Sequence, residues 1–320
     1  MSRNTGLYAA ILVGAGVAWG ATQPLSKVAV STGHQPLGLI FWQLVIAVVL
    51  LALYNTARRR PLPLHRGALV TYLVIALTGT LLPNSMSYLA VVHLPAGIMS
   101  IAIATVPMVA FPIALALGSD RFSWARLAGL GLGLAGVALI ALPSSSLPEP
   151  GMVGWLGIAL LPSLLYAIEG NYVARFGTAG CGPVQALLGA SLVGAILALP
   201  LALASGQWID PRQDIGQAEL ALITSSAIHA GAYVAYVWLI GRAGAVFAAQ
   251  VAYVVTGAGV LWAMVLLGES YSGWVWLALG AMMAGLALVQ PRGAELAIAV
   301  PAPTPQDGTD ARPTGAVETS

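Results

Sequence analysis

The sequence is dominated by ten apolar runs, separated by short stretches of charged and turn-forming residues. About 20 mainly apolar residues are needed for a helix to cross the hydrocarbon core of a bilayer. Only 8% of the residues are charged, against about 25% in a typical soluble domain. The runs therefore predict an all-α integral membrane protein and exclude an ordinary cytosolic enzyme. The expected transmembrane helices are residues 7–29, 37–57, 68–90, 95–117, 124–143, 152–174, 182–204, 218–240, 244–267 and 273–290.

Arginine residues cluster in the loops on one side of the expected spans. Residues 58–60, in the loop after the second span, are all arginine, and Arg66 follows them. Loops rich in Lys and Arg stay in the cytoplasm, and with ten spans both termini lie on the same side as this loop. Of the 13 Lys and Arg, only Lys27 and Arg212 then lie on the opposite side. The pattern predicts a multi-pass protein of the cytoplasmic (inner) membrane with both termini cytoplasmic.

The two halves of the chain resemble each other. Residues 123–142 and 272–291 are identical at seven of twenty positions. Five spans in each half is an odd number, so the second half inserts upside down relative to the first. Inverted repeats are typical of secondary transporters, whose substrate site lies near the midplane between the halves. The expected units are residues 1–143 with five spans, residues 150–290 with five spans, and a proline-rich disordered cytoplasmic tail over residues 291–320.

Polar and aromatic residues recur at helical spacing within five of the expected spans. Residues three or four positions apart share one helix face, and polar groups inside a membrane usually face the bundle interior or a water-filled cavity. For Tyr88 the alternative is the interfacial aromatic belt, and for Gln250 or Gln43 a hydrogen bond between helices. The predicted substrate-binding residues are Trp19 and Gln23, Asn84 and Tyr88, Tyr166 and Glu169, His229 and Tyr233, and Gln250 and Tyr253. Span 4 is expected to join this cavity through Pro107.

Two of these residues can exchange protons. Histidine titrates near neutral pH, and burial raises the pKa of a carboxyl group toward that range. Glu169 and His229 are therefore the candidates for proton coupling, although a carrier without coupling fits the sequence equally well. Glu169 could also bind an amine and Lys27 a carboxylate, which would suit a zwitterion, while the alternative for Lys27 is to extend to the membrane surface.

Several motifs point to one known family. They are Trp19-Gly20 in the first span with Lys27 after it, the stretch from Ala96-Gly97 to Pro107, the acidic turns at Asp120 and Glu269, and the glycine-rich spans 5 and 10. With these motifs in two copies of five spans, the chain resembles the drug/metabolite transporter superfamily, and within it the EamA-type ten-helix transporters. The resemblance implies export or exchange of small metabolites, with both termini cytoplasmic.

The chain departs from that family pattern at three positions. Gln43 lies where the family often has an arginine at the start of span 2, and Asp120 replaces the usual glutamate. The counterpart of Pro107 in the second half is Thr256. A substrate assigned by analogy with one characterised member is therefore unsafe.

Other chemistries find little support in the sequence. The single cysteine, Cys181, excludes an intramolecular disulfide and a multi-cysteine metal site. There is no HExxH or GxSxG motif, no basic stripe for nucleic acid, and no ATP-binding motif. We expect no catalytic residue, metal or cofactor. Gly129 and Gly133, together with Gly280 and Ala284, predict close helix packing, either as a rigid scaffold or as a homodimer contact.

These observations predict a secondary transporter in the lipid bilayer, an exporter or exchanger of small metabolites such as amino acids that works by alternating access. Its partners are the small-molecule substrate and the bilayer, with a homodimer as a further option. The main alternative is a proton-coupled multidrug or cation efflux carrier. An intramembrane enzyme is a weaker alternative, which turnover of a lipid or peptide would favour.

Overall fold

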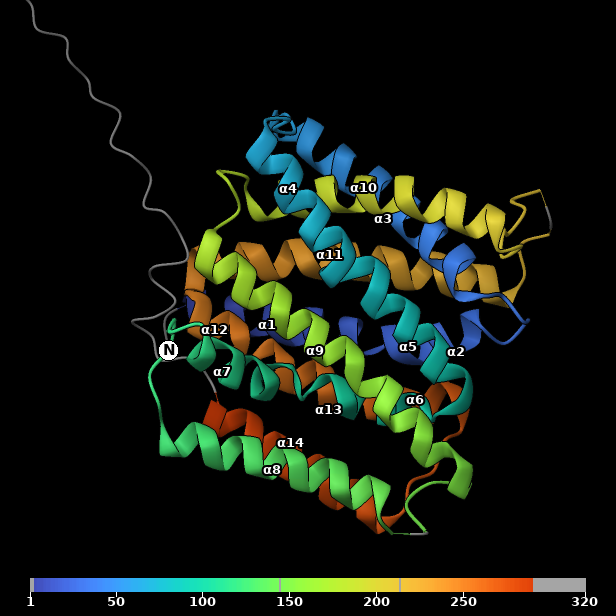
Figure 1. Ribbon diagram of the computed structural model, residues 1–320, viewed down its shortest axis with the longest axis vertical. Coiled ribbons are helices and arrows are strands. Elements are labelled where there is room, and N and C mark those ends of the chain that lie inside the picture. Colours follow the sequence, from blue (N-terminus) through green and yellow to red (C-terminus); the bar gives the residue numbers. More distant parts are fainter. Residues whose placement is uncertain (1–2, 144, 213, 290–320) are drawn as a thin grey trace, which may run out of the picture.

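The computed structural model describes residues 3–143, 145–212 and 214–289, and within these ranges the chain is helical and contains no strand (Figure 1). The elements in chain order are α1 (Arg3–Gly20), α2 (Thr22–Ala29), α3 (Pro36–Ala57), α4 (Arg66–Ile75), the π-helix η1 (Ala76–Leu81), α5 (Leu82–His93), α6 (Ala96–Ile103), α7 (Val106–Ala116), α8 (Trp124–Ala141), the 3₁₀ turn η2 (Pro150–Met152), α9 (Val153–Phe176), α10 (Pro183–Ala204), α11 (Gln217–Ala243), α12 (Ala245–Ala249), α13 (Val251–Leu267) and α14 (Gly273–Val289).

Eight helical segments of the described chain are long and apolar enough to cross a membrane. A shorter apolar helix, Gly273–Val289, follows them. The first expected span, 7–29, is divided into α1 and α2. The eight segments are Pro36–Ala57, Arg66–His93, Ala96–Ala116, Trp124–Ala141, Val153–Phe176, Pro183–Ala204, Gln217–Ala243 and Phe247–Leu267.

Three of the expected spans are each divided into two helices. The chain breaks at Ala21 between α1 and α2, at residues 104–105 between α6 and α7, and at Gln250 between α12 and α13. Pro107 lies in the first turn of α7, where its missing N–H removes no helical hydrogen bond. Broken helices inside a membrane occur where the freed backbone groups face protein or a cavity.

The third span contains a π-helix, η1, between α4 and α5. A π-turn holds one more residue per turn than the α-helix and is frequent at functional sites. Thr80 satisfies one backbone group of this segment, because its Oγ1 donates to the carbonyl of Ala76 at 2.7 Å. Pro83 follows in the first turn of α5. The expected single helix 68–90 therefore changes its winding at its centre.

The helices lie side by side, with α8 and α14 paired along one edge of the bundle and α3 with α10 along the opposite edge (Figure 1). Gly129 makes the α8–α14 contact possible, since a Cβ at this position would lie 2.7 Å from the carbonyl oxygen of Gly285. Gly133 faces Met108 of α7. Gly280 and Ala284 are exposed instead. The close packing predicted for these small residues therefore involves Gly129, Gly133 and Gly285, and a homodimer contact stays a prediction.

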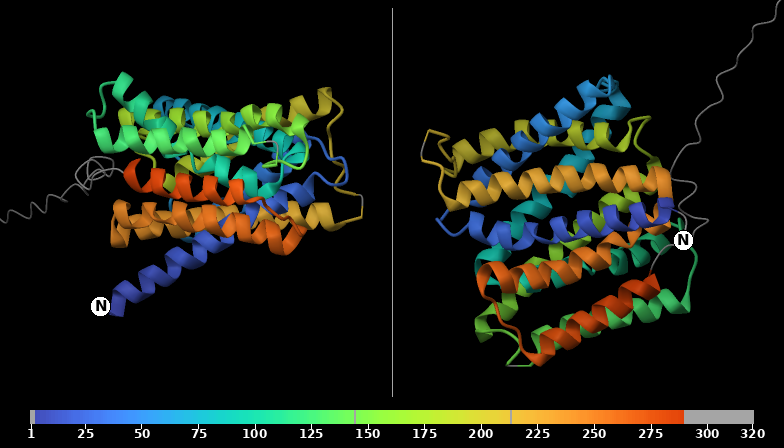
Figure 2. Two further views of the ribbon diagram at one scale, coloured as in Figure 1. Left: turned by 90° about the horizontal axis from the view of Figure 1, so that it is seen from below. Right: turned by 180° about the vertical axis from the view of Figure 1, so that it is seen from behind.

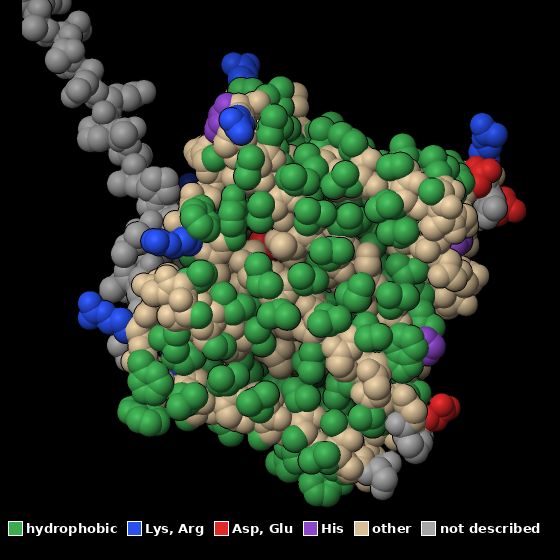
Figure 3. Space-filling model, in the orientation of Figure 1, with side chains coloured by type: hydrophobic (Ala, Val, Ile, Leu, Met, Phe, Trp, Pro, Cys, Tyr) green, Lys and Arg blue, Asp and Glu red, His purple; other side chains and the backbone are tan. Residues whose placement is uncertain are grey.

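The first turns of α1 diverge from the bundle, as the left view of Figure 2 shows. Leu7 in this part has 54% of its surface exposed. The described ends of α1 and α14 lie at the same edge of the molecule (Figures 1 and 2). Lys and Arg side chains gather at this edge, while acidic side chains and a single cluster of blue mark the opposite edge (Figure 3). The expected tail, 291–320, lies outside the described residues.

Candidate functional site: a central cavity

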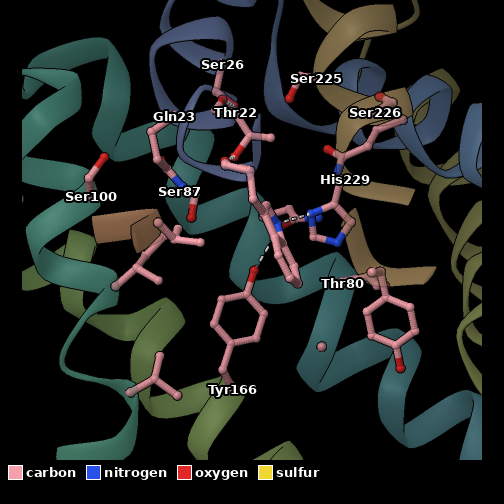
Figure 4. Close-up of a pocket in the computed structure, with 18 of the residues that line it drawn as sticks. Thr22, Gln23, Ser26, Thr80, Ser87, Ser100, Tyr166, Ser225, Ser226 and His229 are labelled. Carbon is pink, nitrogen blue, oxygen red and sulfur yellow. Dashed lines mark hydrogen bonds between the residues drawn. The ribbon is translucent and has the colours of Figure 1, made fainter. Parts of the chain in front are cut away.

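A cavity of about 430 Å³ lies inside the bundle. Ligand pockets usually measure about 300–1,000 Å³ and are mostly apolar with a few convergent polar groups. Most helices contribute to its wall, including the broken ends at Thr22, Ala104 and Val251. His229 points into the cavity from near the middle of α11, and Tyr166 from near the middle of α9 (Figure 4). This cavity is large enough for a small metabolite.

Eight of the ten predicted binding residues line this cavity, from α1, α2, α5, α9 and α11. The remaining two, Gln250 and Tyr253, do not line it. Gln250 is exposed, and Tyr253 packs against the main apolar cluster. Val251, Ala252, Val255 and Thr256 face the cavity instead. The eight that line it are Trp19, Gln23, Asn84, Tyr88, Tyr166, Glu169, His229 and Tyr233.

Several lining residues were not identified from the sequence as site residues. Gln43, for which the sequence left open a cavity role or a hydrogen bond between helices, brings α3 to the cavity. Ser191 brings α10, whose span was expected to lie outside it. Gln43 carried a signal, since it is a lone amide in an apolar run. Small hydroxyl side chains are common within membrane helices, so they carried none. These hydroxyls are Thr22, Ser26, Thr80, Ser87, Ser100, Ser191, Ser225, Ser226 and Thr256.

Three aromatic side chains hydrogen-bond to polar side chains of the cavity wall. The indole Nε1 of Trp19 donates to Nδ1 of His229 at 3.1 Å, and the two rings meet edge to face. The phenol of Tyr88 donates to Oε1 of Gln43 at 2.9 Å. The phenol of Tyr166 donates to Oδ1 of Asn84 at 3.1 Å. Each bond joins two helices that are distant in sequence, so these pairs fix the shape of the cavity.

Glu169 is the one acidic residue among the lining residues, which include no Lys or Arg. Its carboxylate has no hydrogen bond or ion pair with another described residue. It packs against η1, where a Cβ at Gly79 would lie 2.5–2.7 Å from the carboxyl group. Lys27 lies elsewhere, since its Nζ donates to the carbonyl of Leu94 at 2.6 Å. Lys27 is therefore not among the residues that line the cavity, and it is not placed to bind the carboxylate of a substrate whose amine contacts Glu169.

The turn between α13 and α14 closes the bundle at one end. Glu269 accepts the backbone N–H groups of Ala96 at 2.8 Å and Gly97 at 3.2 Å, and Tyr271 donates to the same carboxylate. Burial and the hydrogen bond to Glu269 raise the pKa of Tyr271, so this phenol remains a donor. The N-terminus of α6 is thereby capped by a negative charge, which the helix dipole favours.

The corresponding acidic turn in the first half behaves differently. Asp120 pairs with Arg126 at the start of α8, within the same half of the chain. Both turns contain a glycine with a positive φ, Gly118 at +65° and Gly268 at +66°. The two turns therefore share a positive-φ glycine, but of their two acidic residues Glu269 bonds to the other half and Asp120 pairs within its own half.

The described residues contain no group of three His, Cys, Asp or Glu that could hold a metal ion. Cys181 is buried, and its Sγ lies 3.3 Å from the phenolic oxygen of Tyr72. The four histidines of the chain lie on separate segments, with His34 paired to Glu219 at 2.5 Å and His93 stacked on Trp155.

Comparison with known proteins places the chain in a family. Residues 6–142 and 153–290 each match the EamA-like transporter family. A stretch of 129 residues is 30% identical to the "Probable terminal-alkyne amino-acid exporter" of Streptantibioticus cattleyicolor, and it spans 39% of this chain and 42% of that relative. A solved structure titled "Crystal structure of protein" is similar in fold, with a TM-score of 0.62 and 16% identity over 88% of this chain and 96% of the other.

Proposed function

Because the chain belongs to the EamA-like transporter family, we propose that it carries small metabolites such as amino acids across the cytoplasmic membrane as an exporter or exchanger. One observation carries this proposal. The central cavity holds a carboxylate, Glu169, that has no partner among the described residues, and the walls around it are aromatic and apolar. Glu169 is partly exposed to the cavity. A carboxylate that is partly withdrawn from water and has no partner is unfavourable, and the ammonium group of a substrate would supply that partner.

The membrane arrangement belongs to the same proposal. Ten spans form two inverted repeats over residues 1–143 and 150–290, with α1 and α2 together as the first span and α14 as the last. Both termini are cytoplasmic. The accumulation of Lys and Arg at the edge where α1 begins and α14 ends supports this orientation (Figure 3), because cytoplasmic loops are enriched in these residues.

Transport then follows from rocking of the two halves around the cavity. The contacts at Glu269 join the first half to the second at the end opposite the termini. Asp120 stays within its own half. Hydrogen bonds also join the halves near the other end, where Gln185 donates to the carbonyl of Pro61 and Asn171 to that of Ala110, so a rocking motion must break contacts at both ends.

A second candidate substrate class follows from the charge of the cavity. Glu169 is unaccompanied by Lys or Arg in the lining, and aromatic rings such as Trp19 and Tyr166 can bind cations through their faces. Organic cations of the multidrug type therefore fit the same site, with Glu169 as a proton acceptor when the cation leaves. The amino-acid exporter among the relatives favours amino acids as the first class to test.

The test is uptake of a labelled amino-acid panel into proteoliposomes, with and without unlabelled substrate inside. We expect saturable uptake that preloading stimulates, because counterflow requires a carrier that alternates between two sides. Glu169→Gln should reduce uptake at least tenfold through loss of a charge-assisted hydrogen bond of about 1.5–3 kcal/mol. Uptake of tetraphenylphosphonium without uptake of any amino acid would favour the cation carrier.

A further inference from the structure

The hydrogen bonds of the cavity wall also indicate how a substrate is oriented in the site, an inference that rests on the proposed function. We propose that Trp19, Tyr88 and Tyr166 act as positioning residues that make His229, Gln43 and Asn84 hydrogen-bond donors. These donors bind the carboxylate of an amino acid, while Glu169 binds its ammonium group.

The pair of Trp19 and His229 determines the tautomer of the histidine. An indole N–H can only donate a hydrogen bond, so Nδ1 of His229 must be the acceptor and carries no proton. In a neutral imidazole the other nitrogen then carries the hydrogen. Nε2 has no hydrogen-bond partner among the described residues, and it retains some accessible surface. His229 therefore presents an N–H donor on the wall of the cavity (Figure 4).

The two pairs of a phenol and an amide also leave N–H donors available to a substrate. Oε1 of Gln43 accepts from the phenol of Tyr88, and Oδ1 of Asn84 accepts from the phenol of Tyr166. In each amide the phenol engages one lone pair of the oxygen, and the NH₂ group is left for another partner. Three aromatic donors thus each engage one acceptor, and His229, Gln43 and Asn84 each keep an N–H donor that these bonds do not use. Such a set suits an anion and is poorly matched to a second cation.

The positions of the donors agree with the size of an amino acid. Tyr166 and Glu169 lie three residues apart on α9, and so they occupy neighbouring turns of one helix face. Tyr166 holds the amide of Asn84, and Asn84 and Glu169 both line the same cavity of about 430 Å³. Opposite charges on one small zwitterion can therefore reach both groups.

The first test measures the tautomer of His229 directly, without any substrate. Protein labelled with ¹⁵N-histidine is studied by NMR in nanodiscs, and the spectrum of His229→Gln identifies the signal. We expect Nε2 protonated and Nδ1 unprotonated. In Trp19→Phe the signal should shift toward a mixture of tautomers. Trp262→Phe is the control, because it removes another indole hydrogen bond to α1, from α13 to the carbonyl of Val17, and leaves His229 untouched.

The second test asks whether the donors act on the carboxylate. L-Leucine and 3-methylbutylamine, its counterpart without the carboxylate, compete against uptake of labelled L-leucine. Tyr88→Phe and Tyr166→Phe should weaken competition by L-leucine about threefold and leave the amine unchanged. His229→Leu should weaken L-leucine about tenfold, which corresponds to one lost hydrogen bond to a charged group. His229→Gln, which keeps an N–H donor, should retain most of the uptake.

The outcomes separate the two proposals. Equal weakening of leucine and the amine, or a protonated Nδ1 in wild type, would overturn the donor assignment while transport itself stands. Wild-type protein that transports no amino acid would overturn the proposed function, and the carboxylate assignment with it, even if the tautomer is as expected. Loss of uptake in His229→Gln with the fold intact would contradict the donor role of His229.

Discussion

The carboxylate of Glu269 accepts the backbone N–H of Ala96 at 2.8 Å, although the two residues are 173 positions apart in the chain. One belongs to the turn before the last helix and the other begins α6. The bond therefore joins the two halves of the molecule at the start of a helix that lines the cavity. Any motion that separates the halves at this end must break it.

We expect Glu269→Gln to loosen this junction. Glutamine keeps one acceptor oxygen but loses the charge, and a charge-assisted hydrogen bond contributes about 1.5–3 kcal/mol. Amide hydrogen exchange at Ala96 and Gly97 should accelerate at least tenfold, as measured by mass spectrometry. Asp120→Asn is the control, because it alters the corresponding turn of the first half and should leave exchange in α6 unchanged. Unchanged exchange in Glu269→Gln would mean that the junction contributes nothing to closure.

Gly79→Ala should displace the carboxylate of Glu169. A Cβ there would lie 2.5–2.7 Å from the carboxyl group, well inside ordinary contact distance. The KM for an amino acid should rise about tenfold, with little change in thermal stability, because the carboxylate moves away from its substrate. Gly170→Ala, next to Glu169 but with open space around it, should leave the KM unchanged. If both variants behave alike, the carboxylate has no fixed position that matters.

Gly20→Ala should destabilise the fold. A Cβ at this position would lie 2.8 Å from the backbone nitrogen of Gly259 and 2.9 Å from the carbonyl of Val255, and backbone atoms cannot turn aside. Overpacking of this kind costs about 1–3 kcal/mol, which thermal unfolding in detergent would detect. Gly14→Ala on the same helix meets no atom within 4 Å and should be neutral. Equal stability of the two variants would show that α1 shifts away from α13 without cost.

The orientation can be tested with a thiol reagent that does not cross membranes. Cys181 is 5% exposed, and Cys181→Ser supplies a background without cysteine. In intact cells, a cysteine at position 212 should react, whereas a cysteine at position 59 should react only after the cells are opened. The reverse pattern would invert the proposed topology.

The apolar runs sufficed to predict an all-helical membrane protein, because long apolar stretches admit few other structures. They could not predict the interruptions. The sequence around Gln250 reads as a continuous helix, yet the chain breaks there and a new helix begins at Val251. Hydropathy averages over a window, so a break of one residue leaves no trace in it. The division of residues 7–29 at Ala21 was not predicted for the same reason.

Helical spacing indicated which polar residues share a face. Asn84 and Tyr88 both line the cavity, as do Tyr166 and Glu169, because spacing along an unbroken helix fixes a common face. Gln250 and Tyr253 are spaced to share a face as well, but neither lines the cavity, because spacing does not say which face of a helix points inward. The bonds between helices, such as Tyr88 with Gln43, depend on tertiary packing, and no local pattern predicts which partners meet.

The π-helix of the third span changes the direction in which the side chains after it point, relative to those before it. Below it, Tyr72 packs against Gly189 of α10, and beyond it, Asn84 faces the cavity. One residue turns an α-helix by about 100°. Deleting a single residue from Ala76–Leu81 would therefore rotate one of these faces away from its partner. With the additional residue of the π-helix, one continuous helical segment can point Tyr72 at α10 and Asn84 into the cavity, which a regular α-helix of the same sequence would not do.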